Sequence, residues 1–305
     1  MPHATTSVST DPRAVAMLLM VVSSVCISFG GLVLRSMETS DAWQINFFRA
    51  LALLAAISLI MILRHRDRTL AEVRKIGAPG LLGGACLALA GMAFLQAITN
   101  TTVANTLFTL SAIPFITAAL AWLLLREPLG RATLATMVAA AIGVGVMMIE
   151  GVGVGSSYGN LMALVTAICF SGFAIIVRRN RQIDMLPTLI VSGVIILIVS
   201  GVWRWGRFDL STQDILLCFL LGGVLSGFAN ALFVAASRHL AAAELTLFML
   251  LEFALGPIWV WLFVNEIPTE LTLVGGAIVI FAVALRAVLE LRSSSRLKRG
   301  RPSPM

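Results

Sequence analysis

Ten apolar stretches constrain this chain more than any other feature of its sequence. Each holds about 20 residues, which as an α-helix rising ~1.5 Å per residue crosses ~30 Å of hydrocarbon. Backbone groups in lipid must satisfy their own hydrogen bonds, so unbroken apolar runs become helices. None shows the alternation of polar and apolar residues that a membrane barrel strand needs. The stretches are 14–34, 43–63, 79–98, 101–125, 132–149, 159–177, 185–203, 213–236, 241–264 and 270–289.

The composition excludes a soluble globular domain. Hydrophobic residues make up 59% of the 305 positions, charged residues make up 12%, and the mean hydropathy is +0.96. Soluble domains carry roughly 25% charged residues. The net charge of +7 is divided among short segments between the apolar runs, which argues against a nucleic-acid partner. We therefore predict an all-α integral membrane protein with ten transmembrane helices, surrounded by membrane lipid.

The positions of the basic residues predict how the chain is oriented. If residues 1–13 lie in the cytoplasm, 18 of the 22 lysines and arginines fall on the cytoplasmic side, including those in the basic tail 290–305. Only Arg35, Arg204 and Arg207 fall outside, and Arg49 lies within the second span. This imbalance is the positive-inside pattern. We expect both termini to be cytoplasmic.

The chain contains an internal repeat. Trp122 and Glu127 recur as Trp261 and Glu266, each 139 positions further along (261 − 122, 266 − 127). The same shift carries the second and third spans onto the seventh and eighth, so residues 14–149 and 159–289 read as two five-helix halves. Because five is odd, the second half must enter the membrane from the opposite side. Inverted repeats are common in secondary transporters, whose substrate site lies at the repeat interface near the bilayer midplane.

Several sequence passages resemble the EamA-type ten-helix members of the drug/metabolite transporter superfamily. They are Asn46–Arg49, Ala97–Glu127, Gly143 with Gly145, Leu251–Phe253, Gly256–Trp259 and Asn265–Pro268. The resemblance implies export or exchange of small metabolites, often amino acids, across the bacterial inner membrane. One departure concerns the prolines: Pro114 aligns with Phe253, and Pro257 falls one turn later. We therefore expect no symmetric hinge.

Glu252 is the most informative residue, because it lies near the middle of the ninth span. A carboxylate there costs at least ~2.5 kcal/mol and must face protein or water. Glu244, Phe248 and Glu252 follow at intervals of four, on one helix face. This face could bind an amine or carry a proton. The alternatives are a protonated structural glutamate at 252 and an interfacial Glu244.

Other polar and aromatic residues mark candidate cavity faces on five helices. Arg49 could bind a substrate carboxylate or brace two helices, and we favour the brace. Amides and aromatic rings that line a cavity suit a zwitterionic or aromatic solute, although polar residues also bond membrane helices to one another. The further candidates for substrate binding are Gln96, Asn105, Phe108, Phe170, Phe173, Asn230 and Phe248.

No sequence pattern indicates catalysis, a cofactor or a metal site. The chain has no Gly-Lys-Ser/Thr P-loop, no His-Glu-x-x-His motif and no soluble segment long enough for a catalytic domain. Its four cysteines all fall within apolar runs, where free cysteine behaves as a small hydrophobe. We predict a secondary transporter of small metabolites, amino acids foremost, working by alternating access as a monomer or homodimer. An uncoupled channel or facilitator is the alternative.

Overall fold

The computed structural model describes residues 11–39, 41–101, 103–148, 157–205, 207–264 and 270–299, and all regular structure in these ranges is helical. The helices are α1 (Pro12–Ser28), α2 (Gly30–Arg35), α3 (Ala42–His65), η1 (Arg66–Arg68), α4 (Thr69–Lys75), α5 (Gly77–Asn100), α6 (Val103–Leu110), α7 (Ile113–Leu120), η2 (Ala121–Leu125), α8 (Arg131–Met148), α9 (Ser157–Arg179), α10 (Thr188–Arg204), α11 (Thr212–Phe219), η3 (Leu220–Gly227), α12 (Phe228–Ala236), α13 (Ala242–Phe248), α14 (Leu250–Val264) and α15 (Glu270–Arg299). Here η1 is a 3₁₀ turn, and η2 and η3 are π-helical.

These elements group into ten apolar rods, which confirms the predicted fold class. Six continuous or kinked helices are long and apolar enough to cross a membrane, and four shorter apolar helices complete the set within the described ranges. The first half contains α1–α2, α3, α5, α6–α7 and α8. The second half contains α9, α10, α11–α12, α13–α14 and α15. The chain is a multi-pass membrane protein.

Side-chain hydrogen bonds cap the start of some of these helices. The carboxylate of Asp41 accepts hydrogen bonds from the backbone N–H groups of Trp43 and Gln44, and the hydroxyl of Ser211 accepts one from Asp214. Such caps satisfy N–H groups that have no partner within the helix. At the other end of the chain, α15 continues to Arg299, so much of the predicted basic tail is the end of a helix.

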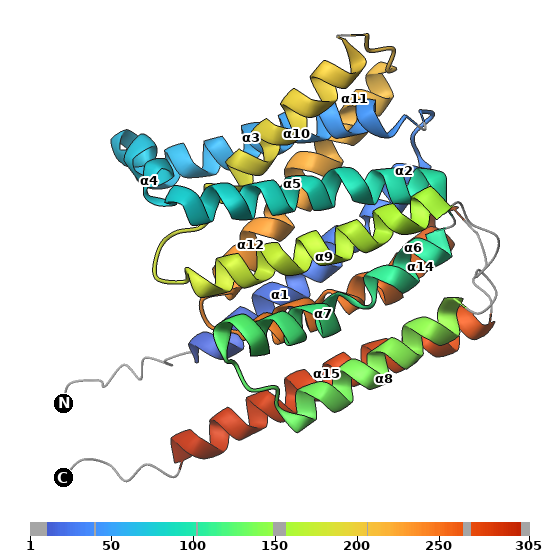
Figure 1. Cartoon of the computed structure of the whole chain (residues 1–305). Helices are drawn as coiled ribbons and strands as arrows, with labels where there is room; N and C mark the ends of the chain where they lie inside the picture. Colours follow the sequence, from blue (N-terminus) through green and yellow to red (C-terminus); the bar gives the residue numbers. More distant parts are fainter. Residues whose placement is uncertain are drawn as a thin grey trace, which may run out of the picture.

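The contacts between the two halves occur in equivalent pairs: a helix of one half packs on a helix of the other, and their counterparts pack in the same way. Where α5 packs on α9, its counterpart α12 packs on α1, and where α7 packs on α9, its counterpart α14 packs on α1. Counterpart rods also pair directly: α3 packs on α10, the fourth rod packs on the ninth through α7 and α13, and α8 packs on α15. Figure 1 shows the last pair side by side at one edge of the bundle. This pattern is a pseudo-two-fold relation between inverted repeats.

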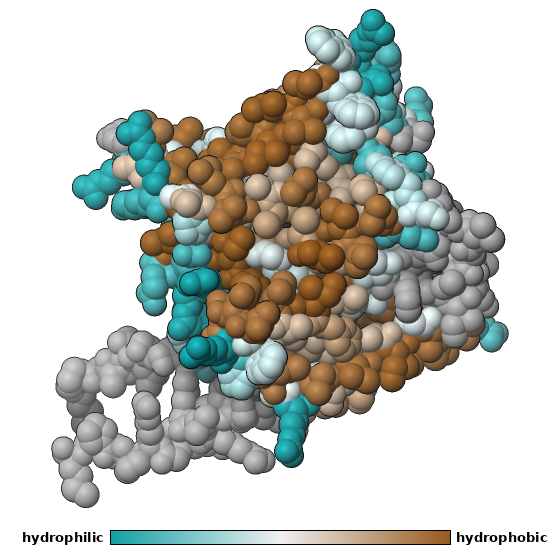
Figure 2. All heavy atoms as spheres, in the orientation of Figure 1, coloured by the Kyte–Doolittle hydropathy of each residue, from teal (hydrophilic) through white to brown (hydrophobic). Residues whose placement is uncertain are grey.

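The bundle has two distinct ends, joined by an apolar belt. We call the end where α1 begins and α15 ends the terminal end, and the opposite end the far end (Figure 1). Figure 2 shows hydrophobic side chains across the middle of this face and hydrophilic ones toward both ends. Leu18, Leu63, Ile198 and Phe281 are among the large apolar side chains that are exposed. An exposed apolar surface of this extent fits contact with lipid.

Candidate functional site

Two of the membrane rods are broken near their middles, at equivalent places in the two halves. In the fourth rod α6 ends at Leu110 and α7 begins at Ile113, while in the ninth rod only Met249 separates α13 from α14. Met249 lies 139 positions after Leu110 (249 − 110). The two breaks are therefore offset by one to two residues from exact equivalence, and the expectation that no hinge is symmetric stays a prediction. Pro114 explains only the first break, because proline has no N–H to continue the helix ladder.

The ninth rod breaks without a proline, through a change of backbone partner. The N–H of Glu252 donates to the carbonyl of Met249 at 3.0 Å instead of to that of Phe248. The released Phe248 carbonyl accepts a 2.8 Å hydrogen bond from the hydroxyl of Ser24, on α1. A buried carbonyl without a partner would cost free energy. Ser24 therefore stabilises the broken form of this helix.

The fourth rod has a corresponding arrangement. Ser171, on α9, donates its hydroxyl to the carbonyl of Ile113 at 3.3 Å, in addition to a bond within its own helix. Since α9 is the counterpart of α1, each broken rod receives a serine hydroxyl from the equivalent helix of the other half. Neither serine was singled out as a site residue in the sequence analysis.

Glu252 lies in the first turn of α14, directly after the break. Its side chain is half-buried and forms no hydrogen bond or ion pair within the described part of the chain. The first turn of a helix carries partial positive charge, which favours a carboxylate there. Broken membrane helices commonly place such half-helix ends at the substrate site. The site therefore offers an acceptor group near the bundle middle.

One face of α14 carries Glu252, Gly256 and Trp259 at intervals of four and three. The Trp259 indole N–H donates to the Ser28 hydroxyl at 2.7 Å, and its ring stacks on Phe29 at a centroid distance of 4.2 Å. Ser28 and Phe29 form the kink between α1 and α2. This face of α14 is therefore directed toward α1. Sequence reasoning had quoted Trp259 only within a motif.

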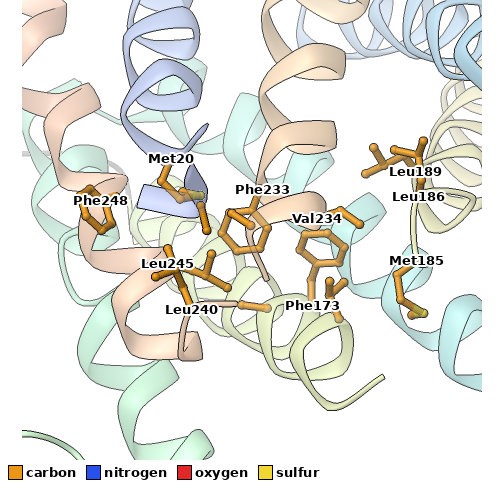
Figure 3. Packing of buried hydrophobic residues seen from close by; sticks show 14 of the residues in the cluster. Met20, Phe173, Met185, Leu186, Leu189, Phe233, Val234, Leu240, Leu245 and Phe248 are labelled. Carbon is orange, nitrogen blue, oxygen red and sulfur yellow. The ribbon is translucent and has the colours of Figure 1, made fainter. Parts of the chain in front are cut away.

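Phenylalanines fill the bundle between Glu252 and the terminal end. Phe170, Phe173 and Phe233 contact one another with ring centroids 5.5–5.8 Å apart. Phe173 is 0% exposed and Phe248 is 2% exposed, within one hydrophobic cluster that also holds Met20. Figure 3 shows Phe173 of α9 beside Phe233 of α12, with Phe248 of α13 on the other side of Met20 and Leu245. The predicted binding aromatics Phe173 and Phe248 are thus both buried in one hydrophobic cluster, and Phe170 is partly exposed.

The predicted amides differ in how they are used. The Asn230 amide N–H donates to the Ser226 carbonyl of its own helix at 2.8 Å. The Asn100 amide nitrogen donates to the Gln96 backbone carbonyl at 2.8 Å and lies 3.4 Å from the Gln96 side-chain Oε1, while Gln96 Nε2 is buried without a hydrogen-bond partner in the described part of the chain. Asn105 and Phe108 belong to α6, but their side chains lie outside the described part of the structure.

Glu244 lies at the terminal end, one helix break away from Glu252. Its carboxylate pairs with Arg13 at 2.7 Å and also accepts a 3.3 Å hydrogen bond from the N–H of Ala241. These contacts join α1 to the start of α13. The geometry matches the interfacial interpretation of Glu244 more closely than a position beside Glu252.

Further ion pairs at the terminal end connect the two halves, and sequence reasoning did not find them. Arg178, at the end of α9, bonds Glu127 at 2.8 Å and also donates to the carbonyls of Ser237 and Arg238 at 3.0 and 3.3 Å. Asp184 lies 3.2 Å from Arg64 and 3.5 Å from Arg238. A cavity of about 310 Å³ beside these groups opens at the terminal end. The sequence shows these charges in loops but not which of them meet.

Comparison with known proteins gives two positive findings. Residues 14–149 and 157–287 each match the sequence profile of the EamA-like transporter family. A solved structure described as "Crystal structure of protein" is similar to 92% of this chain and 99% of its own, with a TM-score of 0.77 and 15% sequence identity. A search of curated proteins finds no match. At this identity the solved structure supports the fold alone.

Proposed function

Because the chain belongs to the EamA-like transporter family, we propose that it is a secondary transporter that exchanges or exports small metabolites by alternating access. The observation that carries this proposal is that the two inverted halves contact one another through equivalent pairs of helices. If the halves swap the conformations of equivalent helices, a pathway closed at one end becomes closed at the other. The family is non-enzymatic, in keeping with the sequence analysis.

The terminal end has the features of a closed gate. Ion pairs join the halves at its surface, and the cluster around Phe173 and Phe233 fills the bundle beneath them. Passage of a solute at this end requires these contacts to separate. In this conformation the pathway would therefore open toward the far end.

We assign the terminal end to the cytoplasm of a bacterial cell, with the chain in the inner membrane. The helix ends on this side carry the basic groups Arg64–Arg74, Arg126–Arg131 and Arg178–Arg181. Cytoplasmic segments of membrane proteins are enriched in such residues. Both termini would then be cytoplasmic.

The proposed solutes are small zwitterions, amino acids foremost. Glu252 would bind their amine or carry a proton, because it is a carboxylate near the bundle middle that has no ion-pair partner among the residues the structure describes. The aromatic rings of Phe170, Phe173 and Phe248 would cover the apolar body of the solute once the cluster separates. Gln96, Asn105, Phe108 and Asn230 complete the proposed binding set.

Counterflow of radiolabelled amino acids into proteoliposomes tests the proposal. Wild-type protein should give saturable uptake that depends on unlabelled amino acid inside. The variants Glu252→Gln and Asn105→Ala should lose most of it. Glu270→Gln is the matched control, because Glu270 is exposed at the start of α15, and it should retain uptake.

Two outcomes would contradict parts of the proposal. Uptake that never saturates and needs no internal solute would indicate a channel. Saturable uptake that is unchanged in Glu252→Gln would remove Glu252 from the site while leaving the transporter in place.

A further inference from the structure

A second charged group lies inside the membrane rods, in the far half of α3. The Arg49 guanidinium donates from one amino group to the Asn46 side-chain oxygen at 3.1 Å and to the Gly91 carbonyl at 3.2 Å. These bonds join α3 to α5. Among the described residues, no aspartate or glutamate lies within 4.0 Å of this guanidinium. The cation is thus held by neutral oxygens only.

The polar atoms beside Arg49 supply donors in excess of acceptors. A guanidinium has five N–H groups, and only one of its amino nitrogens is bonded here. The neighbouring Asn46 is 0% exposed, and its amide nitrogen has no hydrogen-bond partner. Because the Asn46 oxygen already bonds Arg49, that unpartnered amide group lies beside the guanidinium. A positive charge with spare N–H donors in apolar surroundings is suited to an anion.

Two glycines allow neighbouring helices to approach the arginine closely. A Cβ added at Gly91 would lie 2.9 Å from the guanidinium, and one added at Gly222 would lie 2.0 Å from the Arg49 carbonyl oxygen. Any larger residue at position 91 would move the charged group. Gly91 therefore lets α5 approach the guanidinium, and Gly222 lets η3 approach the backbone of Arg49.

We propose that Arg49 and Asn46 bind the carboxylate of the transported solute. A carboxylate matches the planar fork of N–H groups on a guanidinium, and it would accept from the Asn46 amide as well. The two hydrogen bonds to Asn46 and Gly91 then hold the guanidinium in position and leave its other N–H groups available to the carboxylate. This inference rests on the proposed transport function, because the carboxylate is that of the cargo.

Ligand-dependent melting of the purified full-length chain tests the site directly. The probes are phenylacetate and its uncharged analogue phenylacetamide, which differ only at the carboxylate. Wild type should be stabilised by phenylacetate but not by phenylacetamide. Arg49→Gln should raise the half-saturating phenylacetate concentration roughly tenfold or more, because a buried charge pair would lose one partner.

Two further variants separate binding from support. Arg49→Gln could lose binding merely because the protein is less stable. Arg49→Lys keeps the positive charge and therefore serves as the second variant. The Arg49→Lys protein should still prefer phenylacetate to phenylacetamide, but less strongly than wild type. Arg207→Gln changes an exposed arginine at the far end and should bind as wild type does.

Three results would overturn the inference. Equal shifts from phenylacetate and phenylacetamide in wild type would show that no carboxylate is recognised. A phenylacetate shift that survives in Arg49→Gln would show that another group binds it. A shift produced by chloride but not by phenylacetate, and lost in Arg49→Gln, would assign the site to an inorganic anion.

Counterflow of phenylalanine and phenylalaninamide distinguishes failure of the inference from failure of transport. Phenylalanine uptake should fall in Arg49→Gln by a larger factor than phenylalaninamide uptake. Equal losses for the two solutes would mean that Arg49 only braces α3 against α5. If wild type carries neither solute yet melts selectively with phenylacetate, the transport of amino acids fails while the anion site stands.

Discussion

Replacing Gly222 with alanine should strongly destabilise the bundle. The added methyl group would lie 2.0 Å from the carbonyl oxygen of Arg49 and 2.7 Å from its carbonyl carbon. Non-bonded carbon and oxygen atoms need about 3.3 Å, so η3 and α3 would have to separate by about 1 Å. Both obstructing atoms are backbone atoms, which no rotamer change can move. We expect a cost of about 2–3 kcal/mol, at the upper part of the range for overpacked cores.

Thermal unfolding of the detergent-solubilised protein measures this cost. Gly31→Ala is the matched control, because no atom lies within 4 Å of its added Cβ, and it should melt at or slightly above the wild-type temperature. Gly223→Ala should be intermediate, since its nearest contact is the Ala52 carbonyl oxygen at 3.3 Å. Equal melting of Gly222→Ala and Gly31→Ala would refute the close packing of η3 on α3.

Three further predictions concern the broken rods and the terminal end. Ser24→Ala should lower the free energy of unfolding by about 1–3 kcal/mol, because it leaves the Phe248 carbonyl without its donor. Ser171→Ala should lower it less, since the hydrogen bond of Ser171 to Ile113 is longer. The reverse order would contradict the proposed role of Ser24. Phe173→Ala should cost about 3–5 kcal/mol in the same assay, and a loss no greater than that of the partly exposed Phe170→Ala would argue against a packed cluster. Arg178→Gln should increase the rate of thiol labelling at Ala241→Cys in a cysteine-free background. The reason is that the two halves lose the contacts of Arg178 with Glu127 and Ser237. An unchanged labelling rate would mean that these contacts do not keep the terminal end closed.

Hydropathy and periodicity were sufficient to predict the rods and their inverted repeat. The apolar runs specify helices because lipid leaves the backbone no other partner, and Trp122 and Trp261 mark the register of the two halves. The breaks within the rods were not predictable in this way. The break at Met249 depends on a hydroxyl of Ser24, which lies more than 200 positions away. No local pattern encodes such a contact.

For the candidate site too, the sequence predicted the positions of residues along the helices but not their contacts. The position of Glu252 near the middle of its rod follows from counting residues, and the rarity of carboxylates in lipid makes it notable. The sequence could not tell that Phe173 and Phe248 are buried in a hydrophobic cluster rather than lining a cavity. It also could not tell that Glu244 meets Arg13, because that pairing depends on how α13 approaches α1. The local sequence shows which helix face carries a polar side chain, whereas tertiary packing determines which residue that side chain contacts.

The π-helical segment η3 makes the two halves unequal. Its counterpart in the first repeat falls within α5, which is α-helical throughout. A π-helical turn holds more residues than an α-helical turn, so the side chains that follow it point in a different direction around the axis. Exact duplicates would give inward- and outward-open states of equal free energy in a symmetric membrane. If the proposed alternation between the two states holds, η3 is one feature that makes their free energies differ, and the protein would favour one state even without a driving gradient.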